Sequence, residues 1–285
     1  MRSFILGLIL AVTVLLPRAQ AQTHVELNTT VGPLLLELYD TQKPVTVSNF
    51  LHYVTVPFAK EVFFQRWIPG FVLQGGGWVV RAGHETNYVW DQIIGNVITN
   101  EFFVGKRYTN SFGTIAMARI SPFTHSAVST YFINLTNNAY LDGIDGGFTV
   151  FGKVVGNTNL LTTFNDPVGA HGIWTTNLNG YDTNGVPFPG AFNNFPSLRP
   201  GKVEYQDLIF IRPHVINVDI RAAYDRIANS VSFNTLSNYT HVLEVATNLP
   251  PEWKLVTYAL GTGSQISITD NANNQPFRIY RVRIE

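Results

Sequence analysis

Apolar and polar positions alternate along the stretch from His24 to Tyr39, which carries Gly32-Pro33 in its middle. A period of two is typical of half-buried strands, and Gly-Pro marks a turn. We therefore expect two strands joined near residue 32.

The period changes after Pro44, where four apolar residues recur at i, i+3, i+4 and i+7: Val47, Phe50, Leu51 and Val54. This spacing places them on one helical face, and proline is tolerated in the first turn of a helix. The pattern predicts a helix opening at Pro44, and we expect a second short helix at Thr158–Phe164.

Short runs of β-branched and aromatic residues, separated by Gly, Asn or Asp, predict further strands. Residues 165–201 are rich in Gly, Pro and Asn and are expected to form a long loop, followed by a closing strand at Tyr205–Arg212. The other predicted strands are Val62–Phe64, Phe71–Gln74, Val97–Asn100, Gly113–Met117 and Tyr131–Leu135.

Composition narrows the function classes. Hydrophobic residues make up 45% of the 285 residues and charged residues only 13%, about half the usual share. Lys+Arg and Asp+Glu are equal at 19 each, which argues against a nucleic-acid binder with a basic face. The absence of cysteine excludes disulfides, a thiol nucleophile and thiolate metal sites. The seven histidines show no metal-ligand spacing, so we expect no metal site.

The first 21 residues have the pattern of a secretory signal peptide. Arg2 precedes an apolar run at Phe4–Leu16, and the small-residue triplet Ala19-Gln20-Ala21 follows. A membrane-spanning helix would need ~20 apolar residues. We expect residues 1–21 to be removed and the chain to be exported to the periplasm or the extracellular space, without a membrane segment. Loss of Arg2 and Arg18 would leave 17 basic against 19 acidic side chains, a net charge of −2.

The stretch Phe63–Gly77 is the most informative for chemistry. Arg66 stands alone among aromatic and aliphatic residues, and burial of an arginine without a partner is costly. Strand alternation puts Gln74 on the opposite side from Phe71, so only an irregular backbone could bring both to one site. The glycines at 75–77 lack the Gly-Lys-Ser/Thr of a phosphate loop, and close backbone packing is their expected use.

Further motifs follow this stretch in order: Asn100-Glu101-Phe102, GTIAMAR at Gly113–Arg119, STYFINL at Ser129–Leu135, Tyr140-Leu141-Asp142-Gly143 and FTVFGKV at Phe148–Val154. Together the series resembles the cyclophilins, a family of peptidyl-prolyl cis-trans isomerases, from about Val25 to Arg212. The resemblance implies a mainly β fold, with a closed eight-stranded barrel and two short helices. It also implies isomerisation of X–Pro bonds without a cofactor.

The resemblance assigns functional positions residue by residue. Arg66 falls on the family's catalytic arginine, and Phe71 and Gln74 also fall on catalytic-site positions. Substrate-binding positions fall on Phe64, Val72, Ala118, Arg119, Thr130, Phe132, Tyr140, Leu141 and Phe148. Expected ligands are Pro-containing segments of unfolded or partly folded proteins and cyclosporin-like compounds, and a monomer is expected.

Several positions depart from the family pattern. Gln65 replaces a histidine, Val72 a methionine and Thr130 a glutamine. Threonine reaches less far than glutamine and has no amide donor, so support for the arginine should be weaker. Valine is shorter and stiffer than methionine, so the proline pocket should be wider at one wall. Arg119 stands where many members have asparagine, Tyr140 where they have Trp or Phe, and Phe148 where they have His or Tyr.

The residue pattern of the sequence changes near residue 214. Residues 214–285 resemble the small β-sandwich at the C-terminus of many exported bacterial proteins, on the strength of Thr247-Asn248-Leu249, Trp253 and Tyr280-Arg281-Val282. We therefore predict a signal peptide at 1–21, a cyclophilin-like domain at 22–213 and a C-terminal sandwich at 214–285.

Three hypotheses about function remain. The first is an active isomerase, favoured by Arg66, Phe71 and Phe132. The second is a catalytically weak or inactive module that binds Pro-containing segments, favoured by Thr130 and Gln65. The third is a surface or matrix protein whose C-terminal domain determines location, which a pull-down with residues 215–285 would separate from the others.

Overall fold

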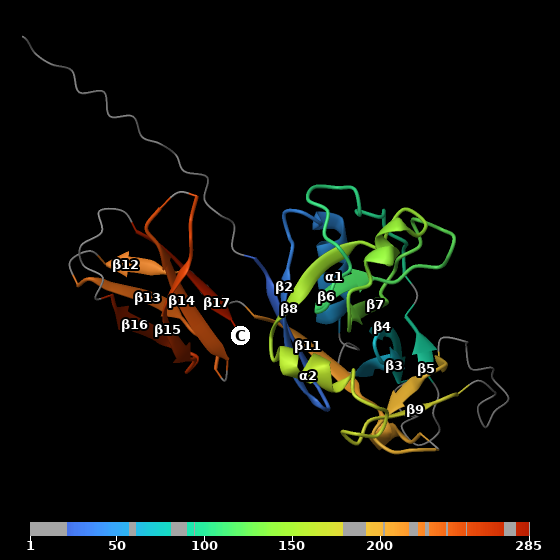
Figure 1. Cartoon of the computed structure of the whole chain (residues 1–285). Helices are drawn as coiled ribbons and strands as arrows, with labels where there is room; N and C mark the ends of the chain where they lie inside the picture. Colours follow the sequence, from blue (N-terminus) through green and yellow to red (C-terminus); the bar gives the residue numbers. More distant parts are fainter. Residues whose placement is uncertain are drawn as a thin grey trace, which may run out of the picture.

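The computed structural model of the chain contains a large β-barrel unit and a smaller unit of two sheets (Figure 1). Among its described residues, no helix is both long and apolar enough to cross a membrane. The predicted signal peptide at 1–21 lies outside them. The structure describes residues 22–56, 61–80, 90–93, 95–178, 192–201, 203–216, 222–225, 228–237, 239–248, 250–270 and 278–284.

The larger unit is a closed barrel, as predicted. Eight strands pair in the order β3-β11-β1-β2-β8-β6-β7-β4, and β4 returns to β3 to close the ring, with β5 added beside β4. Full closure leaves no unpaired sheet edge in the ring. The strands are β1 (His24–Thr29), β2 (Gly32–Leu38), β3 (Val62–Ile68), β4 (Val72–Val80), β5 (Trp90–Gln92), β6 (Thr114–Met117), β7 (Tyr131–Asn134), β8 (Val150–Gly156) and β11 (Phe210–Ile216).

Two helices accompany the barrel, also as predicted. Helix α1 (Pro44–Thr55) begins with proline in its first turn and buries Val47, Phe50 and Val54 in the main core. Helix α2 (Thr158–Thr163) ends one residue before the expected position and buries Leu161. The 3.6-residue period in the sequence therefore marks the face that packs against the barrel.

Two predicted strands are wrong. Val97–Asn100 contains only one isolated bridge, between Ile98 and Ala127, because its remaining backbone does not join the ladder. The strand predicted at Tyr205–Arg212 begins only at Phe210, because Tyr205–Asp207 forms a 3-10 turn.

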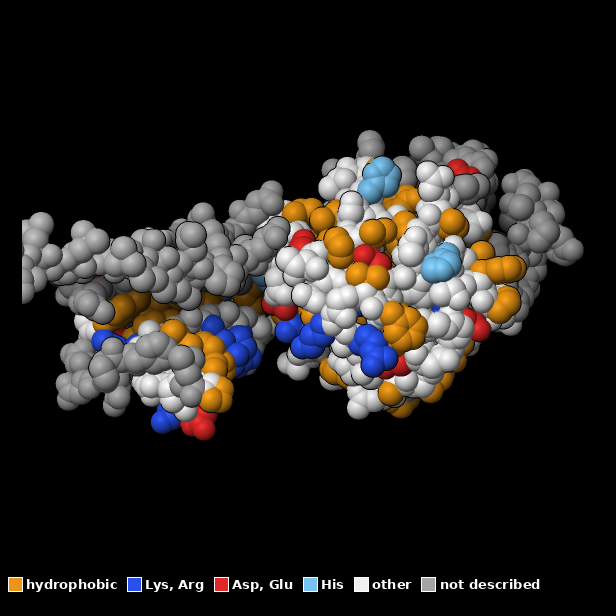
Figure 2. Space-filling view, turned by 90° about the horizontal axis from the view of Figure 1, so that it is seen from above, with side chains coloured by type: hydrophobic (Ala, Val, Ile, Leu, Met, Phe, Trp, Pro, Cys, Tyr) orange, Lys and Arg blue, Asp and Glu red, His pale blue; other side chains and the backbone are white. Residues whose placement is uncertain are grey.

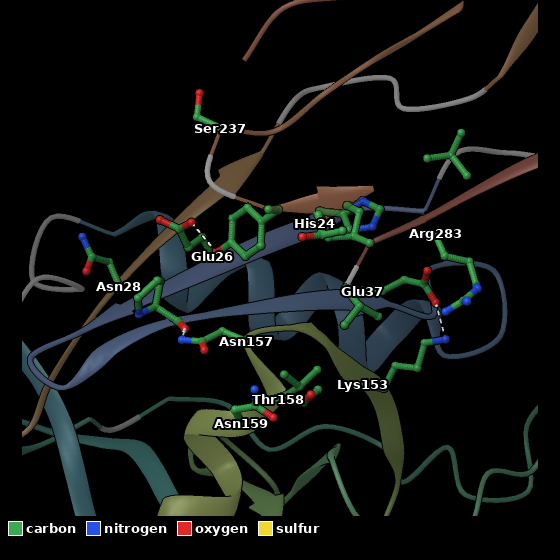
Figure 3. Close-up of a pocket in the computed structure, with 17 residues that line it drawn as sticks. His24, Glu26, Asn28, Glu37, Lys153, Asn157, Thr158, Asn159, Ser237 and Arg283 are labelled. Atoms are coloured by element: carbon green, nitrogen blue, oxygen red, sulfur yellow. Dashed lines mark hydrogen bonds and ion pairs between the residues drawn. The ribbon is translucent and has the colours of Figure 1, made fainter. Parts of the chain in front are cut away.

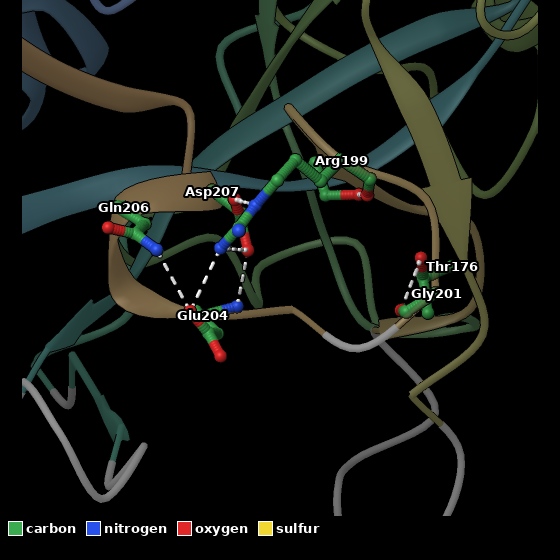
Figure 4. A network of polar contacts seen from close by, with 7 residues as sticks. Thr176, Arg199, Gly201, Glu204, Gln206 and Asp207 are labelled. Carbon is green, nitrogen blue, oxygen red and sulfur yellow. Dashed lines mark hydrogen bonds and ion pairs between the residues drawn. The ribbon is translucent and has the colours of Figure 1, made fainter.

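That turn is held by charged side chains (Figure 4). Asp207 accepts from the Glu204 backbone N–H at 2.7 Å and closes a capping box. Arg199 donates from Nη2 to Glu204 and Asp207, at 2.9 and 3.0 Å. These two carboxylates raise the pKa of Arg199 above its usual value. Locally satisfied backbone and side-chain groups favour the turn over an extended strand here.

The predicted loop at 165–201 contains structure of its own. Strand β9 (Trp174–Thr176) pairs antiparallel with β10 (Phe195–Ser197), while residues 179–191 lie outside the described part. Phe192 and Phe195 pack with Phe63 of β3 in a second apolar cluster. Part of the long connection is thus fastened to the outside of the barrel by aromatic packing.

The C-terminal unit is a small sandwich of two three-stranded sheets, ordered β12-β13-β16 and β15-β14-β17. Val231, Phe233 and Leu243 form the buried centre of its core. Strand β11 of the barrel continues to Ile216, slightly beyond residue 213, where we placed the domain boundary. The sandwich strands are β12 (Ala223–Asp225), β13 (Ser230–Asn234), β14 (Thr240–Ala246), β15 (Lys254–Leu260), β16 (Gln265–Thr269) and β17 (Ile279–Ile284).

The sandwich contacts the barrel beside β1 and β2. Leu35 of the barrel packs in one cluster with Leu236, Tyr239 and Ile284 of the sandwich. The Tyr239 hydroxyl also donates to Glu26 Oε2 at 2.6 Å. A hollow of about 1030 Å³ lies next to this contact, between β1, β2, β8 and the sandwich (Figure 3).

Hydrophobic side chains also reach the solvent on the barrel unit (Figure 2). Phe103, Ile120 and Phe123 are each at least 65% exposed. The low content of charged residues is thus visible on the surface as well as in the composition.

Candidate active site

Arg66 and Gln74 come together at the pairing of β3 with β4. They are register partners, and Arg66 Nη1 donates to Gln74 Oε1 at 3.5 Å. Between Phe64 and Arg66 the register shifts by a bulge, which changes the side on which the arginine emerges. The sequence therefore predicts both residues, but only the bulged register places them side by side.

Phe71 reaches the same site from a turn rather than from a strand. Gly70 has φ +70°, and the Phe71 N–H donates to the Ile68 carbonyl at 3.0 Å. The Phe71 ring lies 6.0 Å from Arg66 Cζ and is stacked on Tyr140 with ring centroids 6.0 Å apart. Strand alternation alone would put Phe71 and Gln74 on opposite sides of the sheet. This turn is the irregular backbone that brings Phe71 to the same site.

An apolar cluster that includes Phe71 lies beside Arg66. Phe132 meets Phe148 edge to face, with centroids 5.7 Å apart. The cluster unites six of the predicted site residues: Phe71, Val72, Ala118, Phe132, Leu141 and Phe148. Tyr140 is 58% exposed and stands at its rim. An apolar surface with a few polar groups is typical of a small-ligand site.

Phe64 was wrongly predicted as a substrate-binding residue. Its side chain is fully buried and belongs to the main barrel core, with Leu73 and Ile211 among its cluster partners. Strand alternation turns it inward, so a bound peptide could not touch it.

Thr130 lies against β4 at Gly77. Any Cβ at Gly77 would collide with the Thr130 hydroxyl, so the missing glycine side chain makes room for it. Gly75 and Gly76 are equally crowded, by Ile211 and Tyr131, which confirms the expected close packing of the glycine run. Among the described contacts, no hydrogen bond joins Thr130 to Arg66.

The electrostatic setting of Arg66 is unusual for an arginine. The side chain is half-buried, and this burial lowers its pKa from the usual value, while Tyr140 acts in the opposite direction. Within the described part of the chain, no carboxylate lies at ion-pair distance from Arg66. Arginine nevertheless stays protonated at any working pH, so an uncompensated positive charge faces the apolar cluster.

No group of acidic, histidine or cysteine side chains among the described residues could hold a metal ion. The site thus offers a fixed cation with several N–H donors and an apolar surface. Such a site can bind an apolar ring and stabilise charge on a neighbouring atom.

The family model described as "Cyclophilin type peptidyl-prolyl cis-trans isomerase/CLD" matches residues 24–177. The chain is a cyclophilin. Peptidyl-prolyl cis-trans isomerase A of Dickeya dadantii is 42% identical over 139 residues, which cover 48% of this chain and 68% of the relative. An Acinetobacter baylyi peptidyl-prolyl cis-trans isomerase is 40% identical over 139 residues, covering 48% and 69%.

Solved structures include similar chains. A Cryptosporidium parvum cyclophilin-type isomerase, crystallised in the presence of the dipeptide Ala-Pro, has a TM-score of 0.44 and 21% identity. The similarity covers 68% of this cyclophilin and 99% of that chain.

A set of asparagines supports this cyclophilin site and was missed in the sequence. Asn138 Nδ2 donates to the Phe71 carbonyl at 2.9 Å and to Asn134 Oδ1 at 2.8 Å. Asn134 is fully buried on β7 and donates to Thr114 Oγ1 at 2.9 Å. The Asn-rich run after β7 was the available signal, because asparagine side chains commonly fasten turns.

Proposed function

We propose that this cyclophilin accelerates X–Pro rotation with Arg66 as the catalytic residue, above a proline pocket formed by Phe71, Val72 and Phe132. The observation that carries the proposal is the half-buried, carboxylate-free guanidinium at the edge of the apolar cluster. Leu141 and Phe148 complete the pocket, and the main chain of Ala118 and Arg119 contacts the residues before the proline.

The rotational barrier of the X–Pro bond sets how much transition-state stabilisation such a site must supply. Rotation about a peptide C–N bond costs ~18–20 kcal/mol because that bond is partly double. An acceleration of ~10⁵ asks for roughly 7 kcal/mol of preferential transition-state binding. No bond is made or broken, so a nucleophile and a proton shuttle are unnecessary.

Arg66 can provide that preference. As the amide twists, the proline nitrogen becomes pyramidal and gains a lone pair, which an N–H of Arg66 can meet. Gln74 occupies one N–H of the guanidinium, and arginine carries five such donors. Because the guanidinium is half-buried beside the Phe71 ring, its effect on a developing charge is stronger than it would be in bulk water. Phe71, stacked on Tyr140, closes the pocket on the side of the arginine.

The test is a proline-isomerisation assay on short X–Pro peptides with the full chain and its Arg66→Ala variant. We expect turnover to fall by about 10²–10³-fold, as for loss of one transition-state donor, with the fold retained. Arg281→Ala, which removes an arginine in the sandwich stacked 4.3 Å from Trp253, is the matched control and should keep full turnover. Unchanged turnover in Arg66→Ala would refute the role of the arginine.

The alternative is a module that binds Pro-containing segments without turning them over. Thr130 favours it, because its hydroxyl packs against Gly77 rather than supporting Arg66. Micromolar affinity for an Ala-Pro peptide without any turnover would establish this alternative. Competition by a cyclosporin-like compound would show in both cases that the apolar cluster is the binding surface.

We further propose that the substrates are exported proteins and that the protein works as a monomer in the periplasm or outside the cell. The signal-peptide pattern of residues 1–21 supports export. Fractionation of cells that produce the full chain should find it outside the cytoplasm with residues 1–21 removed. Cytoplasmic protein that retains them would contradict the proposal.

A further inference from the structure

Arg119 joins two loops at the edge of the proline pocket. Its Nη1 donates to the carbonyls of Phe123 and Asp145, at 3.3 and 3.2 Å. Its Nη2 donates to the Ile144 carbonyl at 3.1 Å. The rigid, planar fork of a guanidinium suits such a bridge, because its donors point in several fixed directions at once.

The same guanidinium covers a wall of the pocket. Arg119 Cζ lies 4.3 Å from the centroid of the Phe148 ring, and Phe148 in turn meets Phe132 edge to face. Arg119 Nε is buried and has no hydrogen-bond partner among the described residues. The side chain is therefore held by its two terminal nitrogens and by the ring beneath it, and contact with a partly desolvated ring is favourable.

The backbone that leads into Phe148 needs such a brace. Asp145, Gly146 and Gly147 have φ values of +48°, +84° and +81°, a run that no regular element can hold. Thr124 Oγ1 donates to the Asp145 carbonyl at 2.9 Å, and Ser121 Oγ donates to its carboxylate at 2.9 Å. Together with Arg119, these contacts tie the turn before Phe148 to the neighbouring loop.

We propose that the Arg119 side chain is a positioning residue that holds Phe148 in place as a wall of the proline pocket. The inference rests on the proposed function and deepens it, because it adds a task for the side chain to the main-chain contact expected at this position. A loosened wall weakens ground state and transition state alike, so the effect falls on KM more than on kcat.

The test is a double-mutant cycle on the full chain with an Ala-Pro-containing peptide. Arg119→Ala should raise KM about tenfold and change kcat by less than about threefold. In a Phe148→Ala background the same change should have almost no further effect, because coupled residues are not additive. An effect of equal size in both backgrounds would overturn the proposal.

Two further variants guard against a general loss of structure. Arg119→Lys keeps the positive charge but not the planar guanidinium with its several donors. It should fold, with a KM between that of the wild type and that of Arg119→Ala. Full recovery would show that charge alone suffices and would overturn the bridging role. Arg281→Ala removes another arginine with the same 4.3 Å ring distance, far from the pocket, and should leave KM unchanged.

The inference can fail separately from the proposed function. If the wild type binds the peptide without turnover, the same cycle is measured on Kd, with the same expected tenfold change. If it does not bind, the NMR ring signals of Phe148 decide. Arg119→Ala should shift these signals and speed the flipping of the ring, whereas an unchanged spectrum would overturn the proposal.

Discussion

The proposed proline site at Arg66 and the hollow between barrel and sandwich differ in their electrostatics. At the proline site Arg66 is half-buried beside aromatic rings, and its one described polar partner is the neutral Gln74. In the hollow Glu37 pairs with Lys153 at 3.2 Å, and Glu26 accepts from Tyr239. The hollow is roomy, yet its charged groups are already satisfied. A charge held without a counter-charge is therefore a better sign of chemistry here than volume is.

The two regions also differ in how side chains are held. The walls of the proline site depend on packed rings and on loops braced by amides and a guanidinium. The contact beside the hollow combines an apolar cluster around Leu35 with the hydrogen bond from Tyr239 to the Glu26 carboxylate. We expect changes at the first to affect turnover and changes at the second to affect only stability.

The largest effect should come from Phe132→Ala. Phe132 is 4% exposed at the centre of the pocket cluster, and truncation of a buried phenylalanine costs ~3–5 kcal/mol. Thermal unfolding should detect the lower stability, and turnover should collapse as well. Leu35→Ala, at the contact with the sandwich, is the contrasting variant. It should lower stability while turnover per folded molecule is retained, and equal losses of turnover would remove the distinction between the regions.

The next largest effect should come from mild acid, which we expect to lower the stability of the sandwich without changing turnover. His241 of the sandwich is fully buried, accepts from the Leu236 N–H and lies 3.0 Å from the Tyr239 carbonyl through Nδ1. Burial lowers its pKa below 6.5, so the unfolded chain takes up the proton first. Its contribution to stability is complete above pH ~6.5 and declines as the pH falls from there towards the folded-state pKa.

The melting temperature should therefore fall as the pH is lowered from 7.5 to 5. The decrease should be smaller in the His241→Asn variant than in the wild type. In this variant the dependence of the melting temperature on pH should be weaker but still present, because the buried His24 also has a lowered pKa. Turnover measured at low temperature should stay flat over this range, because Arg66, Gln74 and the apolar residues keep their charge states. A histidine-like step in turnover would show that a titrating group acts at the proline site after all.

A smaller effect is expected from Tyr239→Phe. The change removes the hydrogen bond to Glu26, and solvent can partly replace it, so stability should drop by about 1 kcal/mol without a change in turnover. Tyr258→Phe, at a 58% exposed position on β15, is the matched control and should be neutral. If both variants melt like the wild type, the sandwich is held by its apolar contacts alone.

The smallest expected effect is an increase in turnover. Thr130→Gln would supply a longer side chain with amide donors beside Arg66, and we expect turnover to rise about threefold, equivalent to ~0.6 kcal/mol. Thr130→Ser keeps the hydroxyl and serves as the control. A loss of turnover in the glutamine variant would indicate that packing against Gly77, rather than support for Arg66, determines the residue at this position.

Local patterns in the sequence predicted most of the elements but not all. The 3.6-residue period located α1 correctly, and alternation located β1 and β2. The same reasoning failed at Val97–Asn100, where an extended-looking run finds only one bridge. It failed again at Tyr205, where Asp207 and Arg199 stabilise a turn instead. In the first case the missing ladder partner overrode local preference, and in the second local side-chain bonds stabilised a turn that the strand pattern did not reveal.

The sequence by itself determined the family, the barrel, and the identity of Arg66, Phe71 and Gln74, because motifs and side-chain periods are local properties of the chain. The tertiary structure alone decided that Phe64 turns inward, that Thr130 packs against Gly77, and that the guanidinium of Arg119 lies over Phe148. These features depend on a bulged register and on contacts between separate loops. A one-residue shift in strand pairing reverses the side on which every later residue emerges, and no local pattern in a single chain records it.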